Sequence, residues 1–63
     1  MEIYENVKGF MGWKEGTLFL WVDTDEYNCG MILVEHVGTG QQVIVPPDFW
    51  EDGFAYLRTI EGG

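Results

Sequence analysis

Residues 18–22 are apolar at every position, and this run limits the folds open to a chain of 63 residues. A strand with one solvated face alternates apolar and polar side chains, whereas this segment is apolar on both faces. Residues 31–34 and 43–45 share the pattern. So short a chain covers both faces of such strands only if its sheet curls into a barrel. We therefore expect a curled sheet whose outward apolar side chains are exposed or covered by a second copy.

Five segments have the composition of β-strands, while the signals for helices are weak. Aromatic and β-branched residues are frequent in these segments, and the chain contains a single Ala. Gly38 and Gly40 predict a tight hairpin turn between the third and fourth strands, because glycine adopts positive φ without strain. The predicted strands are residues 2–8, 17–22, 31–37, 42–45 and 54–60.

A proline pair marks the end of the fourth predicted strand. Pro46 and Pro47 cannot donate to a β-ladder, so the strand should stop there. Asp48 is expected to cap a helical turn, with Glu51 three residues later in the spacing of a capping box. A short helical turn before the last strand resembles the layout of SH3-like barrels. The sequence thus predicts one all-β domain over residues 1–63, a small five-stranded SH3-like or open barrel.

Strand direction predicts where the acidic loops lie. In an antiparallel meander, the chain turns at one end of the sheet in residues 23–30 and reaches the same end again in residues 46–53. Lys8 and Lys14 would then lie near the opposite end. We therefore expect an electrically polarised domain with one acidic end.

Catalysis and cofactor binding have little support in the sequence. The chain has no Ser, and Cys29 and His36 are its only Cys and His, so neither a nucleophilic triad nor a closed zinc site is expected. Residues 23–34 begin like a calcium loop, but Asn28 and Val34 replace the Gly and Glu of an EF-hand. We expect no enzyme activity, metal or cofactor, with a weak calcium site between the acidic loops as an alternative.

The net charge favours some classes of binding partner and disfavours others. Eleven Asp and Glu against three Lys and Arg give a net charge of −8, which disfavours direct binding to nucleic acid or to an anionic membrane. No apolar run approaches the ~20 residues of a membrane span, and the acidic N-terminus has the wrong sign for a secretion signal. The single Cys favours a reducing, cytoplasmic setting. Attraction to a basic protein surface and solubility alone remain as explanations of the charge.

The acidic segments and two adjacent aromatic rings form the candidate partner-binding site. Phe49 and Trp50 are neighbours in a turn, where adjacent side chains are not expected to point inward together, so one ring should stay partly exposed. The candidate residues are Asp23, Asp25, Glu26, Asp48, Phe49, Trp50, Glu51 and Asp52.

The leading hypothesis is an acidic protein-binding module. It would act as an inhibitor or adaptor that occupies a basic, nucleic-acid-binding surface of a larger protein, partly as a mimic of nucleic acid. Such a role would suit a small phage or mobile-element protein. Two alternatives are a small-ligand-binding β domain with an aromatic pocket and a structural subunit of a larger assembly. The apolar strands also favour a homo-oligomer.

Overall fold

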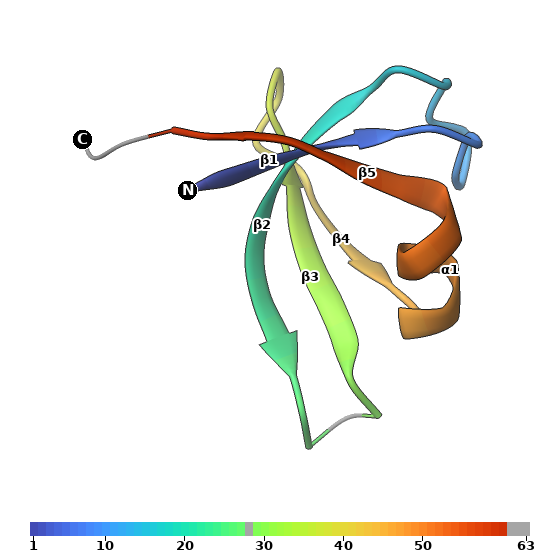
Figure 1. Cartoon of the computed structure of the whole chain (residues 1–63), viewed down its shortest axis with the longest axis vertical. Coiled ribbons are helices and arrows are strands. Elements are labelled where there is room, and N and C mark those ends of the chain that lie inside the picture. The colour runs from blue at the N-terminus through green and yellow to red at the C-terminus, as the bar shows by residue number, and fades with distance from the viewer. Residues whose placement is uncertain (28, 61–63) are drawn as a thin grey trace.

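The computed structural model describes residues 1–27 and 29–60, which form five antiparallel strands in one open sheet and a single short helix (Figure 1). The strands follow the order β4-β3-β2-β1-β5 across the sheet. The predominantly β class is therefore confirmed, and each predicted strand overlaps an observed one. The elements are β1 (Glu2–Asn6), β2 (Leu18–Asp25), β3 (Met31–His36), β4 (Gln42–Val45), α1 (Pro47–Gly53) and β5 (Phe54–Thr59).

Strand β2 extends further than its sequence pattern predicts. It ends at Asp25, so Asp23 and Asp25 are strand residues, and their expected place in a loop is wrong. Between them, Thr24 pairs with the buried residue Ile32 on the neighbouring strand. The strand continues past the apolar run because alternation resumes there, with Thr24 turned toward the core and both aspartates turned away.

The hydrophobic core lies on one face of the sheet, here called the core face, and the opposite face is called the outer face. Phe19, Val34 and Val45 are fully buried on the core face, together with Ile32 and Phe54. These side chains come from four of the five strands. The core therefore ties together strands that are far apart in the sequence.

Aromatic rings surround this core and extend it. The ring of Phe19 meets those of Trp13 and Phe54 edge-on, at centroid separations of 5.5 Å and 5.7 Å, an arrangement that aromatic pairs prefer. Both Phe19 and Phe54 are therefore part of the core. Trp21 packs against the same cluster and is half-buried.

The segment between β1 and β2 folds back against the core. Phe10 and Trp13 are joined by two backbone hydrogen bonds, with N···O distances of 3.1 Å and 2.7 Å. Gly12 has a φ of 86° in the tight turn between them, a conformation that glycine adopts without strain. This turn carries both rings into contact with the core cluster.

Helix α1 begins at Pro47 and has no side-chain cap. Its N-cap residue is Pro46, and Asp48 lies in the first helical turn. The expected capping box of Asp48 and Glu51 is therefore wrong. Proline is favoured at the first helical position because the N–H that it lacks would have no partner inside the helix. The two prolines thus end β4 and start the helix directly.

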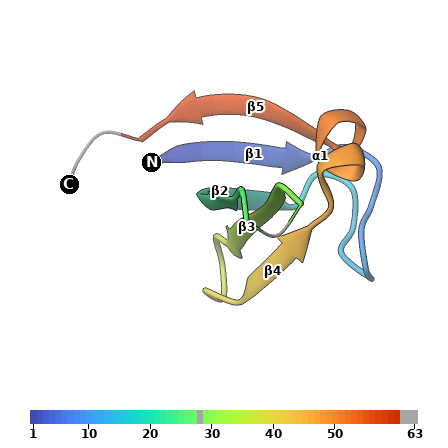
Figure 2. The same ribbon diagram turned by 90° about the horizontal axis from the view of Figure 1, so that it is seen from below.

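Helix α1 connects opposite ends of the sheet. It starts just after Val45, which pairs with Ile32 near the β2–β3 turn. It ends at Gly53, whose carbonyl accepts a hydrogen bond from the Val7 N–H at 2.8 Å, just past the far end of β1. Figure 2 shows α1 beside the end of β1 and the start of β5.

The prediction that residues 23–30 and 46–53 share one end of the sheet is therefore wrong. Strand β5 pairs antiparallel with β1, so it must start where β1 ends. Strand β4 stops at the other end of the sheet, and α1 has to cross between the two ends. Only the first residues after β4 lie near the β2–β3 turn.

Gly53 leaves room for a core ring, and Gly53→Ala is expected to destabilise the domain. An added Cβ would lie about 2.8 Å from Cδ1 of Phe49 and closer still to Cε1 of the same ring. Because Phe49 packs between Phe10 and Phe54, the ring has little freedom to move. We expect a loss of about 1–3 kcal/mol in the free energy of unfolding, measured by urea titration. An unchanged midpoint would contradict this packing, and Ala55→Gly is the control at an exposed neighbour.

Candidate protein-binding face

A β-bulge in β2 determines which face carries the two strand aspartates. Trp21 pairs with Val34 and Asp23 pairs with the next residue, Leu33, so Val22 is an extra residue in the ladder. An unbroken period of two would have put Asp23 on the core face with Trp21. The extra residue turns Asp23 and Asp25 to the outer face instead.

A hydrogen bond supports this reading of the bulge. The indole Nε1 of Trp21 donates to Oγ1 of Thr24 at 3.3 Å. These two side chains therefore lie on the same face, although three positions separate them. In a regular strand, residues three apart would point to opposite faces. The bulge thus spares two carboxylates from burial and exposes them together.

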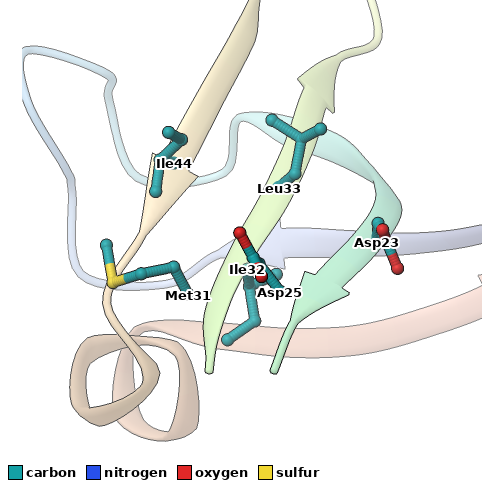
Figure 3. Close-up of a pocket in the computed structure, with 6 residues that line it drawn as sticks. All are labelled: Asp23, Asp25, Met31, Ile32, Leu33 and Ile44. Carbon is teal, nitrogen blue, oxygen red and sulfur yellow. The ribbon is translucent and has the colours of Figure 1, made fainter. Parts of the chain in front are cut away.

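Beside these carboxylates lies a shallow hollow of about 180 Å³ on the outer face of β2, β3 and β4 (Figure 3). Its side chains combine aliphatic groups with negative charge, and no Lys or Arg is among the described residues that line it. Ile44 is 55% exposed, so an apolar surface is open to a partner there. The lining residues are Asp23, Asp25, Met31, Ile32, Leu33 and Ile44.

Local hydrogen bonds hold the two carboxylates in place. Oδ1 of Asp23 accepts from the backbone N–H of Thr24 at 2.8 Å, and Oδ1 of Asp25 accepts from that of Tyr27 at 3.1 Å. Bonds of this kind are why Asp is frequent near turns. Both side chains remain exposed. These hydrogen bonds hold the two carboxylates in place and leave their negative charge exposed.

The β2–β3 turn extends the same acidic end. Glu26 and Tyr27 are exposed, and the Tyr27 side chain is fully exposed. The Gly30 N–H donates to the Asp25 carbonyl at 3.0 Å and closes the turn. Asn28, which enters the rejected EF-hand pattern, lies outside the described residues. An exposed Tyr beside three acids adds a ring of the kind that is enriched at protein interfaces.

The helix carries the remaining candidate acids on a separate part of the surface. Asp48, Glu51 and Asp52 are exposed on α1. The hollow on the outer face is lined by β2, β3 and β4 and by none of these helix residues. The structure therefore brings Asp23 and Asp25 together at one hollow and does not bring the helix acids to it.

The two adjacent aromatic residues of the helix both pack inward. Phe49 lies 4.8 Å from the Phe10 ring, and Trp50 lies 4.5 Å from Tyr4 and stacks on Phe54 at 4.9 Å. Both are half-buried. The partial exposure expected of one ring is thus present, but the premise that both cannot point inward is wrong. Neighbours on a helix point about 100° apart, so Phe49 reaches Phe10 while Trp50 reaches Tyr4 and Phe54.

Tyr4 joins this aromatic group at the edge of the core. Its hydroxyl donates to Oε1 of Glu2 at 3.3 Å, and its ring meets Tyr56 edge-on at 5.7 Å. Burial, followed by the negative charge of Glu2 and by this hydrogen bond, raises the pKa of the Tyr4 hydroxyl. The Tyr4 ring thus packs against the rings of both Trp50 and Tyr56. They form an extension of the core and not a set of walls around a space.

A second hollow, of about 390 Å³, lies beside the edge strand β4. It adjoins the first one, because Ile44 lines both. Trp13 is its only aromatic lining residue among those the structure describes. The lining residues are Met11, Trp13, Gln41, Gln42, Val43 and Ile44.

Sequence reasoning missed the apolar half of the first hollow. Met31, Leu33 and Ile44 belong to segments that are apolar on both faces, which predicts outward apolar side chains but not where they meet. Their meeting point depends on the strand register, which pairs Leu33 with both Asp23 and Ile44. In residues 18–22 the expected exposure is smaller, because Phe19 is buried and the others are half-buried.

The charge distribution keeps part of the expected polarity. Asp23, Asp25 and Glu26 lie at the end of the sheet where β2 turns into β3. Lys8 and Lys14 lie in the connection between β1 and β2, which is at the opposite end of the sheet. The acidic end therefore exists, built by β2 and its turn without the helix.

Two further residues, His36 and Cys29, have side chains of types that can take part in catalysis or metal binding. His36 stacks on Trp13 at 4.4 Å, and its Nδ1 lies 2.9 Å from Oγ1 of Thr39. Cys29 is exposed in the turn and has a φ of 58°. Within residues 1–27 and 29–60, no three His, Cys, Asp or Glu side chains are grouped so as to hold one metal ion.

No known protein family matches the chain, and neither a curated protein nor a solved structure matches it. In the described part of the chain, no helix is long and apolar enough to cross a membrane. The functional interpretation therefore rests on the geometry of the outer face.

Proposed function

We propose that this protein is an acidic protein-binding module that occupies a basic surface of a larger partner through the outer face of β2, β3 and β4. The observation that carries the proposal is the hollow in which Asp23 and Asp25 lie across β3 from the exposed side chain of Ile44. Carboxylates that face water and have no Lys or Arg among the described lining residues are free to meet cations of a partner. The aliphatic side chains of the hollow add apolar contact area, which charged groups alone do not provide.

The chemistry of the hollow favours a Lys or Arg side chain as the group that enters it. Such side chains combine an apolar stem with a charged head, and the hollow combines Leu33 and Ile44 with two carboxylates. A basic surface of this kind is also what binds the phosphates of nucleic acid. The partner is therefore a nucleic-acid-binding protein, and this module acts as its inhibitor or adaptor.

Several finer features belong to the same proposal. Strand order β4-β3-β2-β1-β5 with a short helix before the last strand supports an SH3-like barrel. The acidic residues of α1, with the partly exposed rings of Phe49 and Trp50, form a weaker secondary contact on a separate part of the surface. A reducing cytoplasmic setting and a phage or mobile-element source fit the single free Cys, the small size and the charge.

The proposal is tested by reversing charge on the outer face. The protein is immobilised, its partner is captured from a cell lysate and purified, and the binding kinetics are measured at low and high salt. Asp23→Lys with Asp25→Lys is expected to slow association by about tenfold and to weaken its salt dependence, because exposed charges mainly steer the encounter. Circular dichroism checks that the double variant is folded.

A matched variant separates a local site from net charge. Asp48→Lys with Asp52→Lys changes the total charge equally, but on α1. We expect its effect on association to be at least about threefold smaller than that of the β2 pair. Equal effects would contradict a site on β2. A duplex DNA that binds the partner should compete with this protein, and simultaneous binding of both would overturn the proposed inhibition.

A further inference from the structure

Strand β5 is an edge strand that is open on both faces. It pairs with β1 alone, and every residue of the strand after Phe54 is exposed. Tyr56 is 54% exposed and Leu57 is 46% exposed, and Ile60 follows with similar exposure. Large apolar residues that are uncovered along an open edge are typical of a surface that another strand covers.

The free edge also presents unpaired backbone groups. The Val7 N–H donates to the Gly53 carbonyl, and Glu5 pairs with Ala55 in the same register. In an antiparallel ladder, alternate residues direct their N–H and C=O groups toward the neighbouring strand. Phe54 and Tyr56 therefore direct theirs away from β1. A further strand would find donors and acceptors at these positions.

The opposite edge of the sheet is less suited to strand pairing. Strand β4 has four residues, whereas β5 has six. Pro46 and Pro47 follow β4 at once and end its ladder. Short edge strands and prolines are devices that limit edge-to-edge pairing. Strand β5 has neither, and its one irregularity is the extra residue Leu57, which stands between the β1-paired residues Tyr56 and Arg58.

Charge indicates which occupant fits this edge. The chain carries a net charge of −8, so two copies repel wherever their acidic surfaces meet. Strands β1, β2 and β3 each contain Asp or Glu, and β4 is uncharged. Strand β5 contains Arg58 and no acid. Both edge strands are therefore free of acids, so a second copy that pairs at an edge brings no strand carboxylates together, and the greater length of β5 favours pairing there.

We propose that two copies of this chain associate through antiparallel pairing of their β5 strands. Because Tyr56 presents its backbone groups outward, the two Tyr56 residues form the central pair. This register buries Tyr56 and Leu57 of each copy at the seam. It also places the two Arg58 side chains on opposite sides of the two-fold axis, so that they do not face each other. The two five-stranded sheets then join into one continuous sheet.

The first test compares Lys substitutions at two aliphatic residues of similar exposure, Leu57 and Ile44. Leu57→Lys puts a charge at the seam in both copies, whereas Ile44→Lys changes the outer face and leaves β5 intact. By sedimentation analysis we expect a dimer for the wild type and for Ile44→Lys, and at least about tenfold weaker association for Leu57→Lys, because a buried unpaired charge is costly. A wild-type monomer at all concentrations, or equal weakening in both variants, would overturn the proposal.

Salt separates this association from binding to a basic partner. Screening of two like-charged copies strengthens their association, while screening of opposite charges weakens binding. We expect the dimer dissociation constant to fall by about threefold or more between about 20 mM and about 500 mM NaCl. A constant that rises with salt would contradict pairing at β5, and it would leave the outer-face proposal untouched.

Crosslinking tests the register. In a Cys29→Ser background, Tyr56→Cys should form a disulfide-linked dimer on mild oxidation, since directly paired strand residues have Cα atoms about 5.5 Å apart. Thr59→Cys is the control, because its two copies would lie on opposite sides of the axis and far apart. Efficient crosslinking through Thr59→Cys, or none through Tyr56→Cys in a sample that sediments as a dimer, would exclude this pairing.

Discussion

Phe19→Ala is expected to remove about a third or more of the protein's free energy of unfolding. The Phe19 side chain is 0% exposed and contacts the rings of Trp13, His36 and Phe54. Truncating a buried Phe costs about 3–5 kcal/mol, because apolar contacts are lost and a cavity remains. A domain of this length has a total stability of roughly 3–9 kcal/mol. The loss is therefore of the same order as the whole free energy of unfolding.

Urea titration followed by tryptophan fluorescence measures this loss, since Trp13 lies against Phe19. Ile44→Ala is the control, because its side chain is more than half exposed and should shift the free energy of unfolding by no more than about 0.5 kcal/mol. Similar unfolding midpoints for Phe19→Ala and the wild type would show that the core is not centred on this ring.

The strands and the position of the helix were predictable because local physics determines them. Aromatic and β-branched residues favour strands, and each predicted segment overlaps an observed strand. Pro46 and Pro47 end β4 for a covalent reason, since neither has an N–H to donate.

The outer-face site was only half predictable, because it depends on a bulge. Nothing in the run Trp21, Val22, Asp23 marks Val22 as the residue that leaves the ladder. Strict alternation would bury Asp23 beside Trp21, at a high cost for a carboxylate. That cost is the one clue that the sequence offers to the bulge. The pairing of Leu33 with Ile44 depends on the register of distant segments.

The direction of α1 could not be predicted from the sequence, for a different reason. The antiparallel meander correctly relates β2, β3 and β4, but it leaves β5 unplaced. Once β5 pairs with β1 at the other edge, the connection after Val45 must cross the sheet, and the acids of α1 move away from Asp25. The error therefore lies in long-range topology, which strand propensity does not encode.

Asn6→Asp should be the most damaging change of a polar side chain. Asn6 is 0% exposed, and its Oδ1 accepts one hydrogen bond, from the Lys8 N–H at 3.3 Å. Its Nδ2 is buried without a hydrogen-bond partner. The substitution keeps the shape of the side chain but replaces a neutral amide with a carboxylate. A buried charge with so few donors costs several kcal/mol, or about as much as the fold can lose.

The pH dependence of this variant distinguishes buried charge from altered packing. Burial raises the pKa of the introduced carboxyl above its unfolded value, because the charged form is disfavoured. The folded state then binds the extra proton, so the destabilisation is small below the unfolded pKa and grows as pH rises toward the folded one. Relative to the wild type at each pH, we expect the deficit in unfolding free energy to be largest near neutral pH and to shrink toward about pH 4. Asn6→Ala is the control, because it removes the amide without adding charge and should show a deficit that does not vary with pH. A deficit in Asn6→Asp that is equally constant would mean that the carboxyl reaches water and that Asn6 is not sealed in the core.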